Sequence, residues 1–512
     1  MSGDRSVGAP SVAARTVRGA IWSYSSYVGG RLLVLASTAV LARLLAPSQF
    51  GVVAVALSSI VLLEALGDLG LNQALIVSDA SDLDEHADTV FISSVGVGVL
   101  LSALAAGVGP LAASFFHQHT LTTLIPVLGL NFLLRSFGNT HFALAQREID
   151  FRKRTYAEFF DVVSRGLTGI GLALAGAGAW SLVIGYLAGT TTRGVVAWTL
   201  VRWRPTLRLR RRHIPGLLRF GGPLAGVNVL AAVGGNVDNV LIGRVLGSTA
   251  LGFYSLAFRL PELIVLNLAL VAGEALFPAF AALGRSAIGT AFVKSLRYTL
   301  MVVVPAAVGL AVLATPVMLA LFGSKWRVAA DPMRVLAVYG LAVTLGIPAG
   351  TAYKTVGRPD IALKLAIPRI AVLVAAIVLL VHHGIVAVAG AQAGAAAIFD
   401  LIGIWVAKRV LNVAWADIGS AFVAPVLAGA AMAGVMIVVR DWLGAPVPTL
   451  IAASIAGLVA YLGSLMLLDR TAMREALGLL RGRLRSRGTT GLPDPAQALE
   501  TEVARSPAHE PR

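Results

Sequence analysis

The stretch RWRPTLRLRRRHIPGLLR, residues 202–219, contains seven arginines and separates two long apolar regions of the chain. Loops between membrane-spanning segments carry most of their Lys and Arg on the cytoplasmic side. This stretch therefore indicates which side of a membrane faces the cytoplasm. It also divides the 512 residues near their midpoint, and the second half repeats the plan of the first.

The composition is that of a polytopic membrane protein. Hydrophobic residues make up 57% of the chain and charged residues 13%, whereas soluble domains carry about 25% charged residues. The net charge of +16 falls in short loops between apolar segments, which argues against a nucleic-acid partner. Cysteine is absent, so the chain has no disulfide and no thiolate metal site.

The apolar segments predict an all-α fold of about fourteen transmembrane helices, because a spanning helix needs roughly 20 apolar residues. The first six predicted helices are 19–42, 51–76, 87–113, 119–144, 158–177 and 179–201. The next six are 220–246, 250–281, 297–322, 331–352, 362–382 and 385–407. Two more are predicted at 418–439 and 447–468.

The loop charges predict that both termini are cytoplasmic. With the N-terminus inside, thirty of the forty-two Lys and Arg fall in inside segments or within four residues of them, and six fall in or equally near outside loops. Residues 1–18 then form a cytoplasmic N-terminal segment, and residues 471–512 form a basic cytoplasmic tail whose composition indicates disorder. The loop between the second and third predicted helices is acidic and does not contribute to this bias.

An internal repeat relates the two halves. Residues 43–57 read RLLAPSQFGVVAVAL and residues 244–258 read RVLGSTALGFYSLAF, so that Arg43 matches Arg244 and Gly51 matches Gly252 at a constant offset of 201. Both segments mark the turn from the first to the second helix of a six-helix block. Because six is even, the two blocks have the same orientation, as in transporters with parallel repeats.

The repeat predicts six segments of chain. They are the cytoplasmic segment 1–18, an N-lobe at 19–201, a basic interlobe loop at 202–219, a C-lobe at 220–410, two added helices at 411–470 and the tail at 471–512. Paired lobes of this kind enclose a central site that faces one side of the membrane at a time.

Several blocks resemble the oligosaccharide flippases of the polysaccharide transporter family, near the colanic-acid exporter branch of the multidrug/oligosaccharidyl-lipid/polysaccharide superfamily. They are LARLLAPSQFG (41–51), GDLGLNQALI (67–76), AQREIDFRKRTYAE (145–158) and NVDNVLIGRVLGSTALGFYSLAFRLPEL (236–263). The similarity runs from about residue 15 to 468. It implies an alternating-access flippase in the bacterial inner membrane that moves polyprenyl-pyrophosphate-linked oligosaccharide for surface polysaccharide export, alongside polymerases and glycosyltransferases.

Three arginines of the N-lobe are candidates for binding such a substrate. Arg31, Arg135 and Arg193 lie inside predicted helices, where a charge needs a partner or a wet cavity. A guanidinium binds phosphate oxygens with two parallel hydrogen bonds. The alternatives are an ion pair for Arg31, and side chains that reach the lipid headgroups for Arg135 and Arg193.

Carboxylates in the same half suggest ion coupling. Glu64 and Asp68 are four residues apart and share a helix face, where one of two adjacent carboxylates would hold a proton. They could equally pair with Arg31. The spacing of Asp161 and Arg165, and of Arg259 and Glu262, predicts ion pairs within helices.

Polar residues elsewhere leave two interpretations open. Asn228, Asn236 and Asn239 share one face of the seventh helix and either bind sugar hydroxyls or link helices. The basic loop 202–219 anchors the chain on anionic lipids, recruits an anionic lipid-linked substrate, or does both. Histidines at 117, 119, 382 and 383 lie in short outside loops, where solvated side chains are the expectation.

No catalytic motif, metal site or cofactor is expected, and the chain is interpreted as a carrier rather than an enzyme. The alternative function is transport of another cargo by a related member of the superfamily, either a peptidoglycan precursor or a drug or cation in exchange for an ion. A cation exporter should have an acidic cavity, whereas this N-lobe carries arginines. A glycosyltransferase or polymerase is disfavoured because the outside loops are short.

Overall fold

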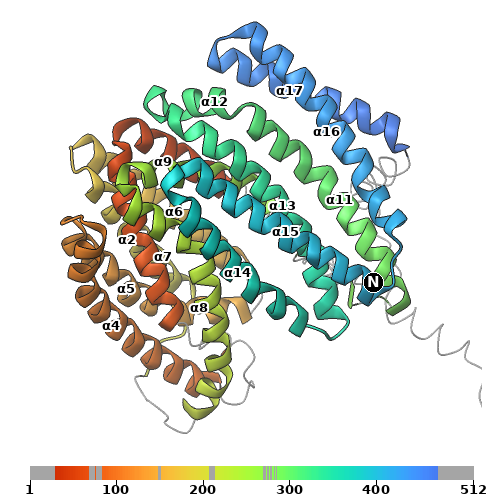
Figure 1. The fold of residues 1–512 in the computed structure, drawn as a ribbon. Coiled ribbons are helices and arrows are strands. Elements are labelled where there is room, and N and C mark those ends of the chain that lie inside the picture. Colours follow the sequence, from red (N-terminus) through yellow and green to blue (C-terminus); the bar gives the residue numbers. More distant parts are fainter. Residues whose placement is uncertain are drawn as a thin grey trace, which may run out of the picture.

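The computed structural model describes residues 29–67, 83–147, 151–206, 214–268 and 285–470, together with isolated residues between these ranges. The predicted segment 1–18, the start of the first helix, the tail 471–512, Asp68 and the arginines from 208 to 212 lie outside the described residues. The described chain is helical with connecting turns (Figure 1).

The first half contains a helix through residues 29–44 and five further helices. These are α2 (Pro47–Gly67), α4 (Leu83–Phe116), α5 (Leu121–Arg147), α6 (Phe151–Leu174) and α7 (Ala179–Leu200). Neighbouring pairs α4–α5 and α6–α7 pack side by side, and α5 also packs on α2 and α7. We call this group the N-lobe.

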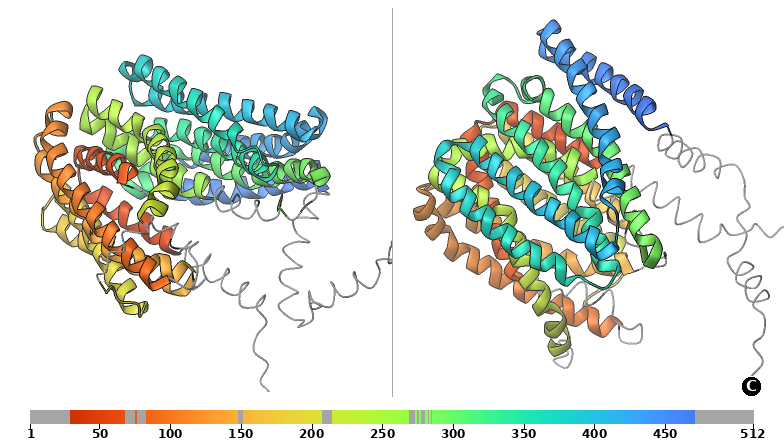
Figure 2. Two further views of the ribbon diagram at one scale, coloured as in Figure 1. Left: turned by 90° about the horizontal axis from the view of Figure 1, so that it is seen from below. Right: turned by 45° about the vertical axis from the view of Figure 1, so that its right-hand side comes forward.

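The second half begins with α8 (Ile214–Val245) and ends with α15 (Ile385–Leu411). Between them lie α9 (Gly247–Leu260), the π-helix η3 (Pro261–Leu266), α11 (Arg285–Val312), α12 (Ala314–Val317), η4 (Met318–Phe322), η5 (Ser324–Ala329), α13 (Ala330–Thr355), α14 (Asp360–Leu380) and η6 (Val381–His383). We call this group the C-lobe. Figure 2 shows the two lobes as separate groups of helices.

Two more helices, α16 (Trp415–Leu443) and α17 (Pro446–Leu468), form a hairpin at the edge of the C-lobe (Figure 1). Helix α16 packs on α11. The Tyr461 hydroxyl of α17 donates to the Met301 carbonyl of α11 at 2.9 Å. At the end of α17, Asp469 lies 3.4 Å from Arg297 of α11. The hairpin is thus attached to the C-lobe mainly along α11, and α17 also packs on α12.

The all-α multi-pass architecture is confirmed, whereas the helix count of fourteen stays a prediction. Within the described residues, ten helices are long and apolar enough to cross a membrane. Each of the fourteen predicted ranges overlaps helical residues. The helices α6, α7 and α8 are not among the ten, and α6 and α7 carry the N-lobe charges Asp161, Arg165 and Arg193.

Some helices extend beyond their predicted ends, because polar residues predicted as loops form the first turns of a helix. The ninth helix, predicted at 297–322, begins at Arg285 and ends at Val312. The predicted acidic loop contributes the first turn of α4, where Asp84 and Glu85 favour the helix N-terminus through its dipole. Asp88 is buried in α4 and accepts a hydrogen bond from the backbone N–H of Thr206 at 2.9 Å.

The lobes meet at the end that the charge bias predicts to be external, which we call the outer end. Lys325 Nζ donates to the Arg43 and Leu45 carbonyls at 2.9 and 2.7 Å. Trp326 Nε1 donates to the Ala42 carbonyl at 2.8 Å, and its buried ring packs edge-on against Phe50. The indole therefore joins both lobes.

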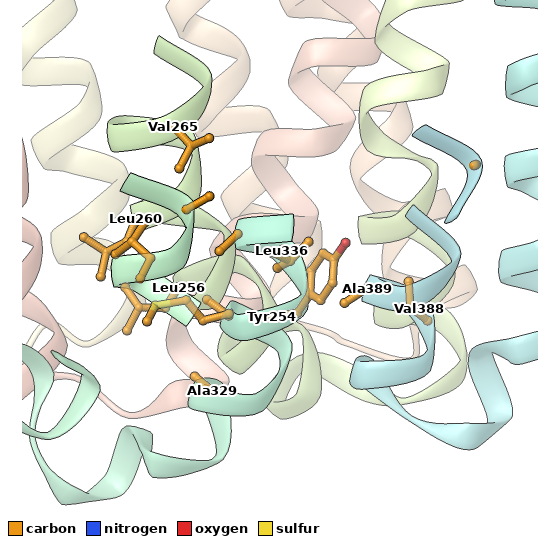
Figure 3. Packing of buried hydrophobic residues seen from close by; sticks show 14 of the residues in the cluster. Tyr254, Leu256, Leu260, Val265, Ala329, Leu336, Val388 and Ala389 are labelled. Atoms are coloured by element: carbon orange, nitrogen blue, oxygen red, sulfur yellow. The ribbon is translucent and has the colours of Figure 1, made fainter. Parts of the chain in front are cut away.

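The C-lobe side of this junction is a continuous apolar core. Figure 3 shows Tyr254, Leu256 and Leu260 of α9 together with Leu336 of α13, and with Val388 and Ala389 of α15. Helix α9 packs on α8 and α13 of its own lobe and on α2 of the N-lobe, so it lies between the two lobes.

We expect Trp326→Ala to lower the free energy of unfolding by roughly 3 kcal/mol or more, because it opens a large cavity at a buried site. Trp442→Ala is the matched control, because that indole is 90% exposed and its loss should leave stability within about 0.5 kcal/mol. Thermal unfolding of the purified variants in detergent measures both. Equal melting temperatures would contradict this account of the junction.

Candidate functional site

An ion pair links two helices of the N-lobe. Arg135 Nη1 of α5 donates to Glu64 Oε1 of α2, and both side chains are about one-third exposed. The sequence left Glu64 as a candidate for ion coupling and Arg135 as a candidate for substrate binding. The structure brings the two together as one ion pair between α2 and α5.

A second pair lies on α6. Arg165 Nη2 is 3.1 Å from Asp161 Oδ1, and the guanidinium carbon of Arg165 stacks 4.4 Å from the ring centre of Tyr186 in α7. Gly189 of α7 lies directly against Asp161, where a Cβ would be 2.2 Å from Oδ1. The absence of a side chain at Gly189 thus leaves room for the Asp161 carboxylate against α7.

Arg193 of α7 has no ion-pair partner among the described residues. Its guanidinium lies 4.1 Å from the ring centre of Phe142. The Nε atoms of Arg193 and Arg135 are both buried and lack a hydrogen-bond partner within the described part of the chain. Both side chains line one small pocket between α5 and α7, together with Asn139 and Thr190.

The remaining N-lobe candidates are placed less fully. Arg31 lies in the helix 29–44 and is partly buried. Asp68 is outside the described residues. Glu64 pairs with Arg135 and Asp161 with Arg165, so neither of these carboxylates pairs with Arg193.

The three asparagines lie on α8, and two have contacts within that helix. Asn236 Nδ2 donates to the Ala232 carbonyl at 2.9 Å, and the backbone N–H of Asn239 donates to Asp238 Oδ1 at 2.8 Å. Asn228 is partly buried. These contacts leave the side-chain oxygen of Asn236 as an acceptor.

Sequence reasoning missed a polar cluster centred on Asp238 of α8. Its buried carboxylate accepts hydrogen bonds at Oδ2 from the Tyr254 hydroxyl of α9 at 2.8 Å and from Gln392 Nε2 of α15 at 3.0 Å. No basic side chain pairs with it among the described residues. A lone Gln in the Ala- and Gly-rich stretch of α15 was the available signal.

The C-lobe also contains charged pairs. Arg259 Nη1 lies 3.0 Å from Glu262 Oε2 where α9 passes into η3. Arg369 Nη1 of α14 lies 3.2 Å from both carboxylate oxygens of Asp400 in α15. In contrast to Asp238, Asp400 has a guanidinium partner, so the described part of the C-lobe contains one paired and one unpaired buried carboxylate.

An apolar cavity of about 480 Å³ lies where the first helix, the C-lobe and the α16–α17 hairpin meet. Leu35 contributes from the N-lobe side, Ile264 from η3, Gly309 from α11, and Met432 and Leu458 from the hairpin. Its volume is in the range of ligand pockets. Such a lining suits an alkyl or isoprenoid chain rather than a polar group.

The chain matches a family of known proteins. Residues 40–331 match the family model described as "Polysaccharide biosynthesis protein". The chain is 28% identical over 491 residues to the succinoglycan biosynthesis transport protein ExoT of Rhizobium meliloti, covering 93% of this chain and 97% of that protein. It is 26% identical over 358 residues to the teichuronic acid biosynthesis protein TuaB of Bacillus subtilis, covering 69% and 74%.

Solved structures share the fold. The lipid II flippase MurJ in an inward closed conformation has a TM-score of 0.67 at 16% identity, covering 88% of this chain and all of that chain. An inward-facing multidrug resistance transporter of the MATE family has a TM-score of 0.61 at 18% identity, covering 75% and 94%. At these identities the likeness concerns the fold alone.

The Glu64–Arg135 pair allows a test of the N-lobe charges. We expect Arg135→Ala alone to destabilise the protein by about 1 kcal/mol, and the double variant Arg135→Ala/Glu64→Ala to destabilise it less, because removing one partner leaves an unpaired charge. Thermal unfolding in detergent measures this.

The control is the exposed pair Arg154–Glu158 of α6, where single and double alanine variants should agree within about 0.5 kcal/mol. A double variant at Glu64 and Arg135 that is less stable than either single variant would contradict the expectation.

Proposed function

We propose, because the chain belongs to the polysaccharide biosynthesis protein family, that it is a carrier that moves polyprenyl-pyrophosphate-linked oligosaccharide across the bacterial inner membrane. The cargo would serve surface polysaccharide synthesis. In this proposal both termini face the cytoplasm, and the lobes rock so that a central site faces one side and then the other. The chain performs no covalent chemistry on the cargo.

The observation that carries this proposal is the unpaired guanidinium of Arg193. A cation at membrane depth without a carboxylate costs several kcal/mol unless water or an anion solvates it. A pyrophosphate supplies that anion, and its oxygens can accept from the buried Nε atoms of Arg193 and Arg135. Arg31 and the polar face of α8 are proposed to extend the site towards the phosphates and sugars.

The lipid part of the substrate needs a separate, dry path. We place part of the polyprenyl tail in the apolar cavity between the first helix, η3 and the α16–α17 hairpin. The rest of the tail would stay in the bilayer. Anionic lipids at the basic loop 202–219 would hold the cytoplasmic side and attract the anionic headgroup. Polymerases and glycosyltransferases remain proposed partners of the pathway.

Arg193→Ala and Arg31→Ala should each slow transport, because each removes charge-assisted hydrogen bonds worth roughly a ten- to hundredfold change in rate. The assay uses purified protein in liposomes and a short-chain polyprenyl-pyrophosphate-linked oligosaccharide. Cargo that reaches the far leaflet is counted by its access to an added glycosidase.

Arg440→Ala is the matched control, because that arginine pairs with Asp441 on the hairpin, away from the N-lobe. All variants should still insert in the membrane, since one missing charge does not overturn the loop bias. Wild-type rates for both Arg193→Ala and Arg31→Ala would exclude this site, and absence of transport by the unaltered chain would exclude the function.

Ion coupling is proposed to use Glu64, Asp68 and, from the structure, Asp238. Collapsing the proton or sodium gradient across the liposomes should lower the initial transport rate severalfold. Asp238→Asn keeps the size of the side chain and one of its two acceptor oxygens but cannot ionise, so its rate should respond less to the gradient. Unchanged initial rates in the unaltered chain after the gradient is collapsed would exclude coupling.

The alternative is transport of another cargo, favoured by the shared fold with the lipid II flippase and the multidrug transporter. A peptidoglycan precursor would use the same cationic contacts, and the liposome assay with lipid II in place of the oligosaccharide separates the two. A cationic drug is disfavoured by Arg193, and binding of cationic dyes would support it.

A further inference from the structure

The two copies of the internal repeat contact each other at the outer end. Glycines 51 and 252 occupy equivalent positions, as do Pro47 and Ser248, at the same offset of 201. A Cβ on Gly51 would lie 1.7 Å from the Ser248 carbonyl oxygen, and a Cβ on Gly252 would lie 1.9 Å from the Pro47 carbonyl oxygen. Because Pro47 and Ser248 are equivalent positions, each glycine lies against the same position of the other repeat.

This reciprocity means that a local two-fold axis passes between the two glycines. The backbone nitrogens complete the pattern, because the Gly51 Cβ would be 2.9 Å from Gly252 N and the Gly252 Cβ would be 3.2 Å from Gly51 N. No side chain separates α2 from α9 here. Real Cβ atoms do not approach backbone so closely, so any other residue at either position must push the helices apart.

The surrounding contacts between the lobes are hydrogen bonds from side chains, which can break and form again. Arg43 Nε donates to the Leu321 carbonyl at 3.0 Å, and Lys325 and Trp326 donate back to carbonyls of the first helix. Gln118 Nε2 lies 3.4 Å from Ser248 Oγ. These donors and carbonyls can all be hydrated when the lobes separate, so opening leaves no buried group unpaired.

A carrier whose site must reach the external side has to open this end, because the lobes meet here. We propose that the Gly51–Gly252 crossing is the closing contact of the outer gate, and that the absence of a Cβ at both positions is what lets the gate shut fully. This inference rests on the proposed function for the need to open. The contact itself depends on the geometry alone.

The absence of cysteine from the chain allows a direct test that measures no transport. Ser248→Cys places one thiol at the contact, where the native side chain is buried. Cells that express it are treated with a membrane-impermeant maleimide added from outside. The Ser248→Cys change is made in four versions of the chain: with no other change, with Gly51→Leu, with Gly252→Leu, and with Gly107→Leu. The last is the control, because a Cβ at Gly107 meets nothing within 4 Å.

We expect labelling of the thiol to rise at least fivefold with Gly51→Leu and to a similar degree with Gly252→Leu, since the two positions are equivalent. The unaltered and Gly107→Leu backgrounds should both label slowly. Equal labelling in all four backgrounds, with equal amounts of protein in the membrane, would overturn the proposal. So would a rise with only one of the two glycine variants.

A second measurement avoids the possibility that a leucine variant fails to fold. Gln118→Cys/Ser248→Cys keeps both glycines and places a thiol on each lobe. A short bifunctional methanethiosulfonate, which spans more than a direct disulfide can, should crosslink the pair in detergent-purified protein and stop transport in liposomes, and a reductant should restore at least half of the rate. Transport that continues with the crosslink intact would overturn the gate.

Discussion

Direct backbone contact between α2 and α9 is the constraint on which the arrangement of the two lobes depends. It exists because Gly51 and Gly252 both lack a Cβ, and it sets how near the lobes come at the outer end. The indole of Trp326 and the ammonium of Lys325 add bonds across the same junction. The packing of α9 against α13 and α15 then transmits this position through the C-lobe.

The two lobes are built on one plan but carry different chemistry. In the N-lobe, carboxylates at 64 and 161 pair with arginines, and Arg193 has no ion-pair partner among the described residues. In the C-lobe, Asp238 is held by neutral donors, the hydroxyl of Tyr254 and the amide of Gln392. We infer a division in which the N-lobe binds the anionic headgroup and the C-lobe provides an ionisable group for coupling.

The fold class was predictable because the signals are long and local. Apolar stretches define helices in lipid, and the offset of 201 identifies the repeat. The equivalence of Gly51 and Gly252 was therefore readable, whereas their mutual contact was not, since an offset relates two positions without placing them together. The predicted start of the ninth helix at 297 is wrong because residues 285–297, whose basic side chains are typical of a cytoplasmic loop, are helical.

The candidate site was less predictable than the fold because its contacts join distant segments. Arg135 was expected to bind substrate, and its partner Glu64 lies 71 residues away in the chain. Asp238, Tyr254 and Gln392 come from three helices, and the isolated Gln392 does not by itself indicate which residues it contacts. Pairs four residues apart, such as Asp161 and Arg165, are the exception, because helix geometry alone brings them together.

We infer that the lobes, which are closed at the outer end, move apart there to deliver the substrate headgroup to the external side. Pulsed electron resonance between spin labels at Leu111→Cys of α4 and Leu379→Cys of α14, both exposed positions, tests it directly in the cysteine-free chain. Adding the polyprenyl-pyrophosphate-linked oligosaccharide should create a population with a longer distance, while a pair within the N-lobe, Leu111→Cys and Leu174→Cys, stays unchanged. A single unaltered distance for the interlobe pair would contradict the claim.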